Sequence, residues 1–408
     1  MKNISLIFLA IFFIHFSSLA QVSIEWDKSF GETEQNIGKC VKQTIDGGYI
    51  IMGSKDDIDA SKYYFWIIKT DSNGDTLWTK SPNDGNNDIG YYIHQTTDSG
   101  YIIVGSRLIE EFGKRDVLLL KTDSFGNTLW TKTFRGNDWN EGKSVQQTID
   151  GGYIILGGSG GDKWSSDVLL IKTDSSGNIL WLKTFGGNNH DIGNSIQQTT
   201  DGGFILVGKV NGVGMVPRGD GLLMKTDVNG DTLWTKTFAG GTWTDFGEVK
   251  QTNDGGYVII GTRMSSSNAD DALFIKTDSL GNTEWSKTFG GNSGDTGASI
   301  QQTIDGGYII TGITGSFGAG AADVWLIRTD TLGDTLWTVT FGETSYEHGY
   351  SVQQTTDGGY IIAGANWFSG VFNGDVWLIK TSIDPVNVKK GETTLISDYQ
   401  LVQNYPNP

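Results

Sequence analysis

Several residue types that support common protein chemistries are scarce in this chain of 408 residues. The single cysteine, Cys40, excludes an intrachain disulfide. The four histidines are not at metal-ligand spacing, and no Gly-x-Ser-x-Gly or phosphate-binding loop lies between a strand and a helix. Acidic residues outnumber basic ones by 47 to 30, and the resulting net charge of −17 argues against binding to nucleic acid or to anionic membranes. The sequence therefore carries few signs of an enzyme.

A long apolar run occurs only at the N-terminus. Lys2 precedes an apolar stretch from Ile4 to Phe16, and Ser18-Leu19-Ala20 has the small-x-small pattern of a cleavage site. The stretch is too short to span a bilayer comfortably. We expect residues 1–20 to be a secretory signal peptide and the mature protein to be soluble, with no membrane insertion.

A repeated phrase, Gln-Thr-x-Asp-Gly-Gly followed by an aromatic residue, dominates the rest of the chain. It occurs seven times at steps of 51 to 53 residues, with Asp-Ser-Gly in the second copy. Such a regular period indicates one supersecondary unit that is copied and stacked on its neighbours. The aromatic residues are Tyr49, Tyr101, Tyr153, Phe204, Tyr257, Tyr308 and Tyr360.

Each copy contains four short runs with the composition of β-strands. In the third copy they cover residues 144–148, 153–157, 167–173 and 179–185, and turn residues such as Asp-Gly-Gly separate them. No helical periodicity is present. Four antiparallel strands in about fifty residues are typical of a propeller blade. We predict an all-β fold, a seven-bladed β-propeller over residues 21–382.

The two ends of the repeat region complement each other. Residues 23–30 match the fourth strand of a copy, with Trp26 at the position of the tryptophan that recurs in fourth strands. The last copy stops after its third strand. We therefore expect Ile24–Phe30 to pair with Val376–Thr381, which would close the ring and remove an exposed edge.

A second repeated phrase carries a resemblance. Lys-Thr-Asp-x-x-Gly-(Asn/Asp)-Thr-Leu-Trp, found at residues 69–78, 121–130 and 225–234, resembles the tryptophan-docking motif of propellers of the pyrroloquinoline-quinone dehydrogenase type. It is one residue shorter between Asp and Gly, and the adjacent cysteine pair and the Asp-centred cofactor pocket of those enzymes are missing. The resemblance therefore implies the scaffold and no quinone. The whole repeat resembles a family of secreted bacterial propellers, some labelled endoglucanase, although the repeats show no catalytic basis for that label.

The C-terminus carries another resemblance. Leu401-Val-Gln-Asn-Tyr-Pro-Asn-Pro408 looks like the opening of a type IX secretion sorting domain. We expect residues 383–398 to be a polar linker and residues 399–408 to be the truncated start of that domain. The resemblance implies recognition by the type IX secretion machinery through the missing C-terminal part. It also implies a location outside a Gram-negative cell, either released or at the outer-membrane surface.

The variable loops gather on one face of the expected propeller, opposite the uniform turns, and form the candidate binding face. An acid or amide stands two residues before a glycine in each repeat, and such a ring could hold Ca²⁺ or attract a cationic group. Alternatively, each side chain caps its own turn. No other cofactor is expected. These residues are Asn36, Asp88, Asn140, Asp191, Asp245, Asp295 and Glu347.

Aromatic and histidine side chains break the repeat in the same loops. They suit stacking on sugar rings or contact with a protein, unless they fold back over the blade tops. They are Trp139, His190, Trp243, Tyr346 and His348 before first strands, and Phe112, Trp164, Phe317, Trp367, Phe368 and Phe372 in the second variable loops.

We predict a monomeric, non-catalytic binding module for a glycan or surface protein. The alternative is an endoglucanase-like glycosidase that uses two carboxylates among Asp88, Asp191, Asp245, Asp295 and Glu347. A third hypothesis is a structural or adhesive module. The predicted binding residues are Asp88, Trp139, Trp164, His190, Asp191, Trp243, Asp245, Asp295, Tyr346, Glu347 and Trp367. No catalytic residue is assigned.

Overall fold

The computed structural model describes residues 22–31, 35–57, 62–82, 87–109, 114–136, 139–160, 166–187, 189–213, 218–239, 243–264, 269–367 and 374–384. In these ranges every regular secondary-structure element is a β-strand. No helix that is long and apolar enough to cross a membrane occurs there. The predicted signal peptide, the C-terminal motif and nearly all of the linker lie outside them.

The 28 strands fall into four classes according to their place in the repeat. The innermost strands are β2 (Asn36–Gln43), β6 (Asn87–Gln95), β10 (Trp139–Gln147), β14 (His190–Gln198), β18 (Thr244–Gln251), β22 (Asp295–Gln302) and β26 (Tyr346–Gln354). The second strands are β3 (Tyr49–Asp57), β7 (Tyr101–Ile109), β11 (Tyr153–Gly160), β15 (Phe204–Val213), β19 (Tyr257–Met264), β23 (Tyr308–Thr314) and β27 (Tyr360–Trp367).

The third and outer classes complete the sheets. The third strands are β4 (Lys62–Thr70), β8 (Lys114–Thr122), β12 (Ser166–Thr173), β16 (Arg218–Thr226), β20 (Asp270–Thr277), β24 (Asp323–Thr329) and β28 (Gly374–Thr381). The outer strands are β5 (Thr76–Lys80), β9 (Thr128–Phe134), β13 (Ile179–Phe185), β17 (Thr232–Phe238), β21 (Thr283–Phe289), β25 (Thr335–Phe341) and β1 (Ile24–Phe30).

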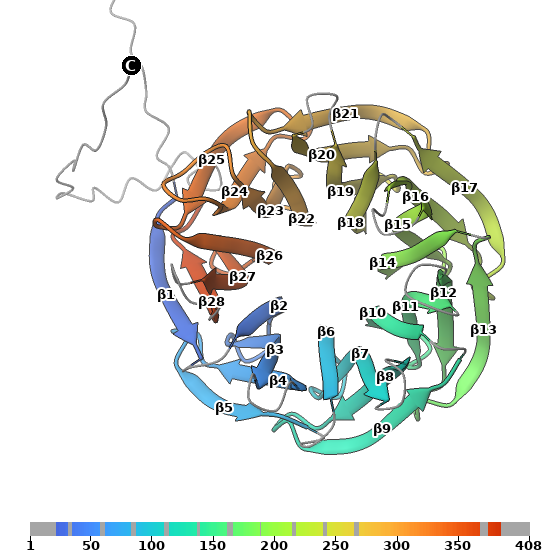
Figure 1. The fold of residues 1–408 in the computed structure, drawn as a ribbon. Coiled ribbons are helices and arrows are strands. Elements are labelled where there is room, and N and C mark those ends of the chain that lie inside the picture. Colours follow the sequence, from blue (N-terminus) through green and yellow to red (C-terminus); the bar gives the residue numbers. More distant parts are fainter. Residues whose placement is uncertain are drawn as a thin grey trace, which may run out of the picture.

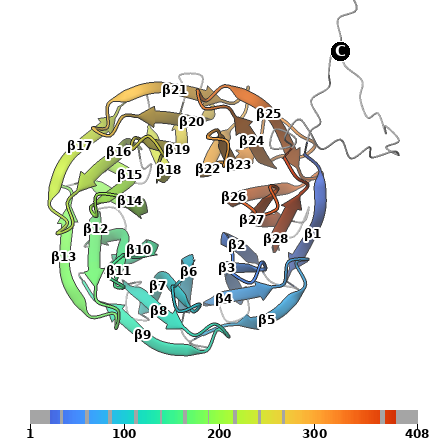
Figure 2. The same ribbon diagram turned by 180° about the vertical axis from the view of Figure 1, so that it is seen from behind.

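Strands of neighbouring classes pair antiparallel into four-stranded groups, and two of these groups are joined into one larger sheet by a single parallel bridge between Trp139 and Arg115. The groups stand side by side around a common centre, with the innermost strands nearest to it and the outer strands at the rim (Figures 1 and 2). The arrangement is all-β and propeller-like.

The two ends of the repeat region meet in one sheet. β1 pairs antiparallel with β28, from Ile24 opposite Thr381 to Phe30 opposite Val376, which confirms the predicted pairing of these segments. Trp26 and Phe30 pack against a buried cluster whose core residues come from the first and last repeats.

Apolar packing between neighbouring repeats forms the core. Ile50 and Ile67 of the first repeat share a buried cluster with Ile103 and Leu118 of the second, and the other clusters likewise draw on two neighbouring repeats. The tryptophan of each outer strand packs on the aromatic residue that follows the next Gly-Gly turn, with ring centroids 5.8–6.2 Å apart. This contact explains why both aromatics recur with the repeat.

The repeated Asp-Gly-Gly turn is held by one carboxylate. In the third repeat, Asp150 accepts hydrogen bonds from the Thr148 hydroxyl at 2.5 Å, the Gly152 amide at 3.0 Å and the Lys172 ammonium at 3.0 Å. Gly151 has φ = 82°, which favours glycine. Despite the cost of burial, the Thr148 and Lys172 hydrogen bonds hold the pKa of Asp150 below its usual value. The phrase is therefore a structural lock for the hairpin.

Glutamine side chains link each turn to the next repeat. The Gln147 Oε1 atom accepts a hydrogen bond from the Thr97 amide of the preceding repeat at 2.9 Å. The same bond joins the two ends of the array, since Gln43 Oε1 accepts from the Thr356 amide at 2.9 Å. The first and last repeats are thus neighbours in the same way as the others.

Removing residues 22–31 should destabilise the fold strongly. The deletion strips Trp26 and Phe30 from their cluster and leaves β28 with an unpaired edge. Because losing one large aromatic from a core costs about 3–5 kcal/mol, we expect Tm to fall by on the order of 10 °C and dimers to form through the edge. Differential scanning calorimetry and size-exclusion chromatography measure both effects. A matched protein lacking only residues 1–21 is the control, and equal Tm values for the two proteins would contradict the role of β1.

Candidate functional site

Two of the predicted ring acids are hydrogen-bonded within their own repeats. Asp191 accepts hydrogen bonds from the amides of Gly187 at 3.0 Å and Asn211 at 2.6 Å. Asp295 accepts from the hydroxyl of Ser316 at 2.6 Å and, more weakly, from its amide at 3.3 Å. Burial raises the pKa of Asp191. These carboxylates cap turns, as the alternative interpretation of the ring proposed.

Two further ring acids are paired with nearby side chains. Asp88 is buried and forms a two-pronged ion pair with Arg107, with both N–O distances 2.9 Å. Asp245 accepts from the Asn194 amide at 2.8 Å and lies 3.6 Å from the Lys209 ammonium. Burial raises the pKa of Asp88, which Arg107 opposes. Both charges therefore have partners within the fold, and Asp88 is buried while Asp245 stays partly exposed.

Glu347 differs from the other ring acids. It is 2% exposed, and its Oε2 atom has no hydrogen-bond partner among the described residues. Burial and the nearby Asp323 carboxylate raise its pKa to about 7. A Cβ atom on Gly342 would lie 2.6 Å from Glu347 Oε2 and 2.3 Å from Asp323 Oδ1, so the two carboxylates converge on this glycine. The pair is enclosed, which leaves a glycoside substrate no direct access to it.

The repeat-breaking aromatics of the loops are mixed in exposure. Tyr346 is 57% exposed and Phe317 is 47% exposed, whereas Trp139 lies beneath the Arg115 guanidinium at 4.9 Å. Trp243 is half-buried. Among the described residues these rings do not form one exposed platform, and Phe112, Trp164, Phe368 and Phe372 lie outside them.

The two histidines of these loops contact their own surroundings. His190 Nδ1 lies 2.7 Å from the Ser166 hydroxyl. His348 bonds the Tyr350 hydroxyl at 2.8 Å, and its ring lies 6.2 Å from that of the half-buried Trp367. Burial lowers the pKa of both imidazoles. The predicted loop residues thus remain candidates.

In the described ranges, no three His, Cys, Asp or Glu side chains are grouped so that they could hold a metal ion. Calcium binding by the ring acids stays a prediction.

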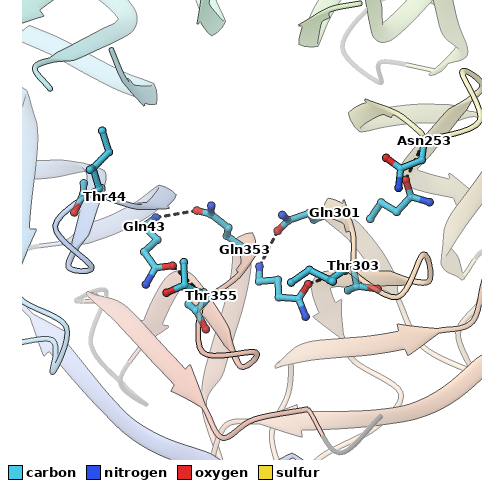
Figure 3. Close-up of a pocket in the computed structure, with 12 residues that line it drawn as sticks. Gln43, Thr44, Asn253, Gln301, Thr303, Gln353 and Thr355 are labelled. Atoms are coloured by element: carbon cyan, nitrogen blue, oxygen red, sulfur yellow. Dashed lines mark hydrogen bonds between the residues drawn. The ribbon is translucent and has the colours of Figure 1, made fainter. Parts of the chain in front are cut away.

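The innermost strands line a cavity of about 370 Å³ that borders a second, turn-side cavity of about 510 Å³. Both share Asn253, Gln301, Gln302 and Gln353. Figure 3 shows the turn-side cavity, with Gln301 and Gln353 at the inner ends of their strands, towards the open centre. The cavities lie on the side of the uniform turns, opposite the face favoured by the sequence.

The wall of the inner cavity follows a repeated pattern. Four of the seven innermost strands end in Ser-(Val/Ile)-Gln-Gln-Thr. Ser351 Oγ accepts from the Val41 amide at 3.2 Å, and Gln353 Oε1 accepts from the Gln43 amide at 2.8 Å. Each such serine and first glutamine therefore satisfies backbone N–H groups of the next repeat.

Three repeats depart from that pattern. The first has Cys40 and Lys42, the second has Tyr92 and His94, and the fifth has Glu248 and Lys250 in place of serine and glutamine. Cys40 is buried, and the other five line the inner cavity. Residues separated by up to about two hundred positions are thereby brought to one chamber.

These departures give the chamber its charge. Glu248 lies 2.6 Å from the Lys250 ammonium and also accepts from the Ile300 amide at 2.9 Å. Burial opposes both charges, but the ion pair holds the pKa of Glu248 below and that of Lys250 above its usual value. Burial, with Lys42 and Lys250, lowers the pKa of His94 to about 4, so His94 is neutral at pH 7.

A second group of cations, which includes Lys39 and Lys143, stands three residues before the chamber positions of the innermost strands. The Lys39 ammonium lies 4.1 Å from the centre of the Tyr91 ring, and Lys143 lies 3.4 Å from the Glu141 carboxylate. Burial and Lys143 lower the pKa of Lys39 to about 8. A protein with a net charge of −17 therefore carries clustered lysines along its innermost strands.

Sequence reasoning missed the chamber residues Lys42, Tyr92, His94, Glu248 and Lys250. The available signal was a departure from the consensus at a fixed position of the innermost strand, whereas the repeat-breaking residues predicted from the sequence lie in the variable loops.

Glu347→Gln should change the pH dependence of stability. The native pKa of about 7 lies above the usual 4.5, so native Glu347 keeps a proton that the unfolded chain releases. Stability is therefore lost as pH rises from 4.5 to 7 and stays lower above. The glutamine avoids this loss. Relative to wild type, its free energy of unfolding should improve by on the order of 2–3 kcal/mol between pH 5 and pH 8.

Urea denaturation at the two pH values measures this difference. Asp295→Asn is the matched control, because it weakens the bonds to Ser316 and should destabilise the protein at both. A Glu347→Gln effect that is equal at pH 5 and pH 8 would refute the strained carboxylate.

No protein-family model and no curated protein matches the chain. Solved structures do match. A protein of unknown function from Dyadobacter fermentans has a TM-score of 0.53 at 11% identity, covering 89% of this chain and 99% of that one. YCF48 bound to D1 peptide has a TM-score of 0.52 at 10% identity, covering 91% and 100%. The Pan2 WD40 domain of Neurospora crassa has a TM-score of 0.51 at 12% identity, covering 85% and 89%. At these identities the similarity concerns the fold alone: the chain is a β-propeller of repeated blades.

Proposed function

We propose that the chain is a closed seven-bladed β-propeller that acts as a non-catalytic interaction module. It binds a peptide segment of a protein partner in the inner cavity, called the inner chamber below, which the peptide enters from the turn side. The observation that carries this proposal is that Lys42, Tyr92, His94, Glu248 and Lys250, all departures from the repeat, line one chamber. Structural parts of a repeat protein are copied unchanged, whereas a binding site needs an asymmetric set of side chains.

Contacts between the first and last repeats support closure. β1 completes the sheet of β26 to β28, and the Gln43–Thr356 bond copies the link between other neighbours. A closed ring leaves no inner strand without a neighbour at its side, which suits a rigid binding chamber.

The surroundings of the acids favour binding over glycoside cleavage. Asp88, Asp191, Asp245 and Asp295 are committed to ion pairs or turns, and Glu347 is enclosed with Asp323. Hydrolysis needs two carboxyl groups that reach a substrate from opposite sides. A peptide ligand is also compatible with the fold, because YCF48 has been solved with a bound peptide.

Selection from a random peptide library tests this function. We expect binders of the mature chain to lose at least about tenfold in affinity, or about 1.4 kcal/mol, with Lys42→Gln/Lys250→Gln. Each substitution introduces the residue that most sister repeats carry, and an unchanged Tm must show that the double variant folds, because Lys250→Gln removes the ion-pair partner of the buried Glu248. Lys236→Gln, on an outer strand, is the matched control.

Two results would contradict this proposal. Peptides that are insensitive to the double variant but lose affinity with Tyr346→Ala would move the site to the variable-loop face. Release of reducing sugar from glucans by the purified protein would replace the binding function with catalysis.

We further propose that the module works outside a Gram-negative cell, on the strength of the N-terminal and C-terminal motifs. Cell fractionation and the N-terminal sequence of the mature protein test this. A cytoplasmic protein that keeps residues 1–20 would contradict it.

A further inference from the structure

We infer that the inner chamber recognises a carboxylate group, supplied by an acidic side chain or a chain terminus of the ligand. This inference rests on the proposed function and names the chemical group that the chamber selects. It follows from the hydrogen-bonding capacity of the walls and from their net charge.

The chamber walls offer many donors and few free acceptors. The carbonyl oxygens of four glutamines are each used by a backbone amide of the next repeat at 2.7–2.8 Å. Because an amide N–H needs an oxygen acceptor, this bond fixes which end of each glutamine is nitrogen. In the described part of the chain the four nitrogens have no protein acceptor. These glutamines are Gln146, Gln197, Gln301 and Gln353.

Two lysines replace glutamine in the same wall. Lys250 is held by Glu248, but no acid among the described residues forms an ion pair with Lys42. The Lys42 ammonium instead lies 5.3 Å from the centre of the Tyr92 ring. A lysine ammonium only donates hydrogen bonds, so both substitutions add donors where the consensus would supply an acceptor.

The charge of the chamber suits a group with one negative charge. Lys42 and Lys250 are cationic, Glu248 is anionic and His94 is neutral at pH 7, which leaves one positive charge uncompensated. A carboxylate would balance it. A phosphate monoester carries about −1.5 to −2 at this pH and would leave excess negative charge inside the ring.

The scarcity of histidine makes the chamber observable by nuclear magnetic resonance. After removal of residues 1–20, the chain keeps only His94, His190 and His348. His94 lines the chamber, whereas His190 and His348 belong to the first residues of their strands, at the variable-loop side. Histidine-labelled mature protein therefore carries one reporter in the chamber and two internal controls.

Three peptides serve as probes. Acetyl-Gly-Glu-Gly-amide offers a side-chain carboxylate, acetyl-Gly-Gly-Gly offers a terminal carboxylate, and acetyl-Gly-Gln-Gly-amide is the neutral control. We expect at least one carboxylate peptide to shift the His94 signal in a saturable way, while the neutral peptide leaves it unchanged. Which carboxylate peptide binds more tightly identifies the source of the group.

The lysine variants complete the test. Lys42→Gln should lower the affinity for the carboxylate peptide at least about tenfold, as expected for loss of a charge-assisted hydrogen bond. Lys236→Gln should leave this affinity unchanged. Unchanged signals of His190 and His348 in the free variants confirm that the fold is kept.

Some results overturn the inference. The inference is wrong if the neutral peptide shifts the His94 signal as much as the carboxylate peptides do, or if neither carboxylate peptide gives a saturable shift. It is also wrong if Lys42→Gln leaves the affinity for the carboxylate peptide unchanged. If library peptides bind through the chamber lysines while the carboxylate peptides fail, the carboxylate inference is wrong and the interaction function stands. If carboxylate peptides bind but the library yields no chamber-dependent binder, the chamber recognises a carboxylate and the proposed peptide-binding function is wrong.

Discussion

The backbone N–H groups along the inner strands are the constraint on which the architecture depends. Among the described residues, each inner strand pairs along its length with one neighbour only, and apart from the single bridges Trp139–Arg115 and Tyr346–Ala322 no strand pairs with the amides of its other edge. Buried amides without partners are costly, so the fold must supply acceptors from elsewhere. The Ser and Gln side chains of one repeat supply them to the next, as Ser351 and Gln353 do for Val41 and Gln43. The same bonds fix the spacing of neighbouring repeats around the centre.

That constraint gives meaning to the three repeats that break it. Glu248 keeps the acceptor role through its bond to the Ile300 amide, but Lys42 and Lys250 have no acceptor atom to offer. Both lysines are only partly buried, so their ammonium groups can meet a ligand that enters the chamber. Lys250 forms a close ion pair with Glu248, whereas Lys42 interacts with that carboxylate only at longer range. The proposed ligand carboxylate would give Lys42 a close anionic partner.

Much of the fold was predictable because it follows from local patterns. The strand alternation, the Gly-Gly turns and the missing fourth strand of the last repeat led directly to the pairing of Ile24–Phe30 with β28. The site was less predictable, because Lys42, His94 and Lys250 meet only when strands of different repeats are arranged around one centre. The sequence likewise gave no sign that Glu347 and Asp323 converge on Gly342.

The position of a bound peptide tests the account most directly. A crystal structure of the mature protein with a selected peptide should place a ligand carboxylate within hydrogen-bonding distance of the Lys42 ammonium and of glutamine amide nitrogens in the chamber. A peptide seated on the variable-loop face, with the chamber filled only by water, would contradict the account.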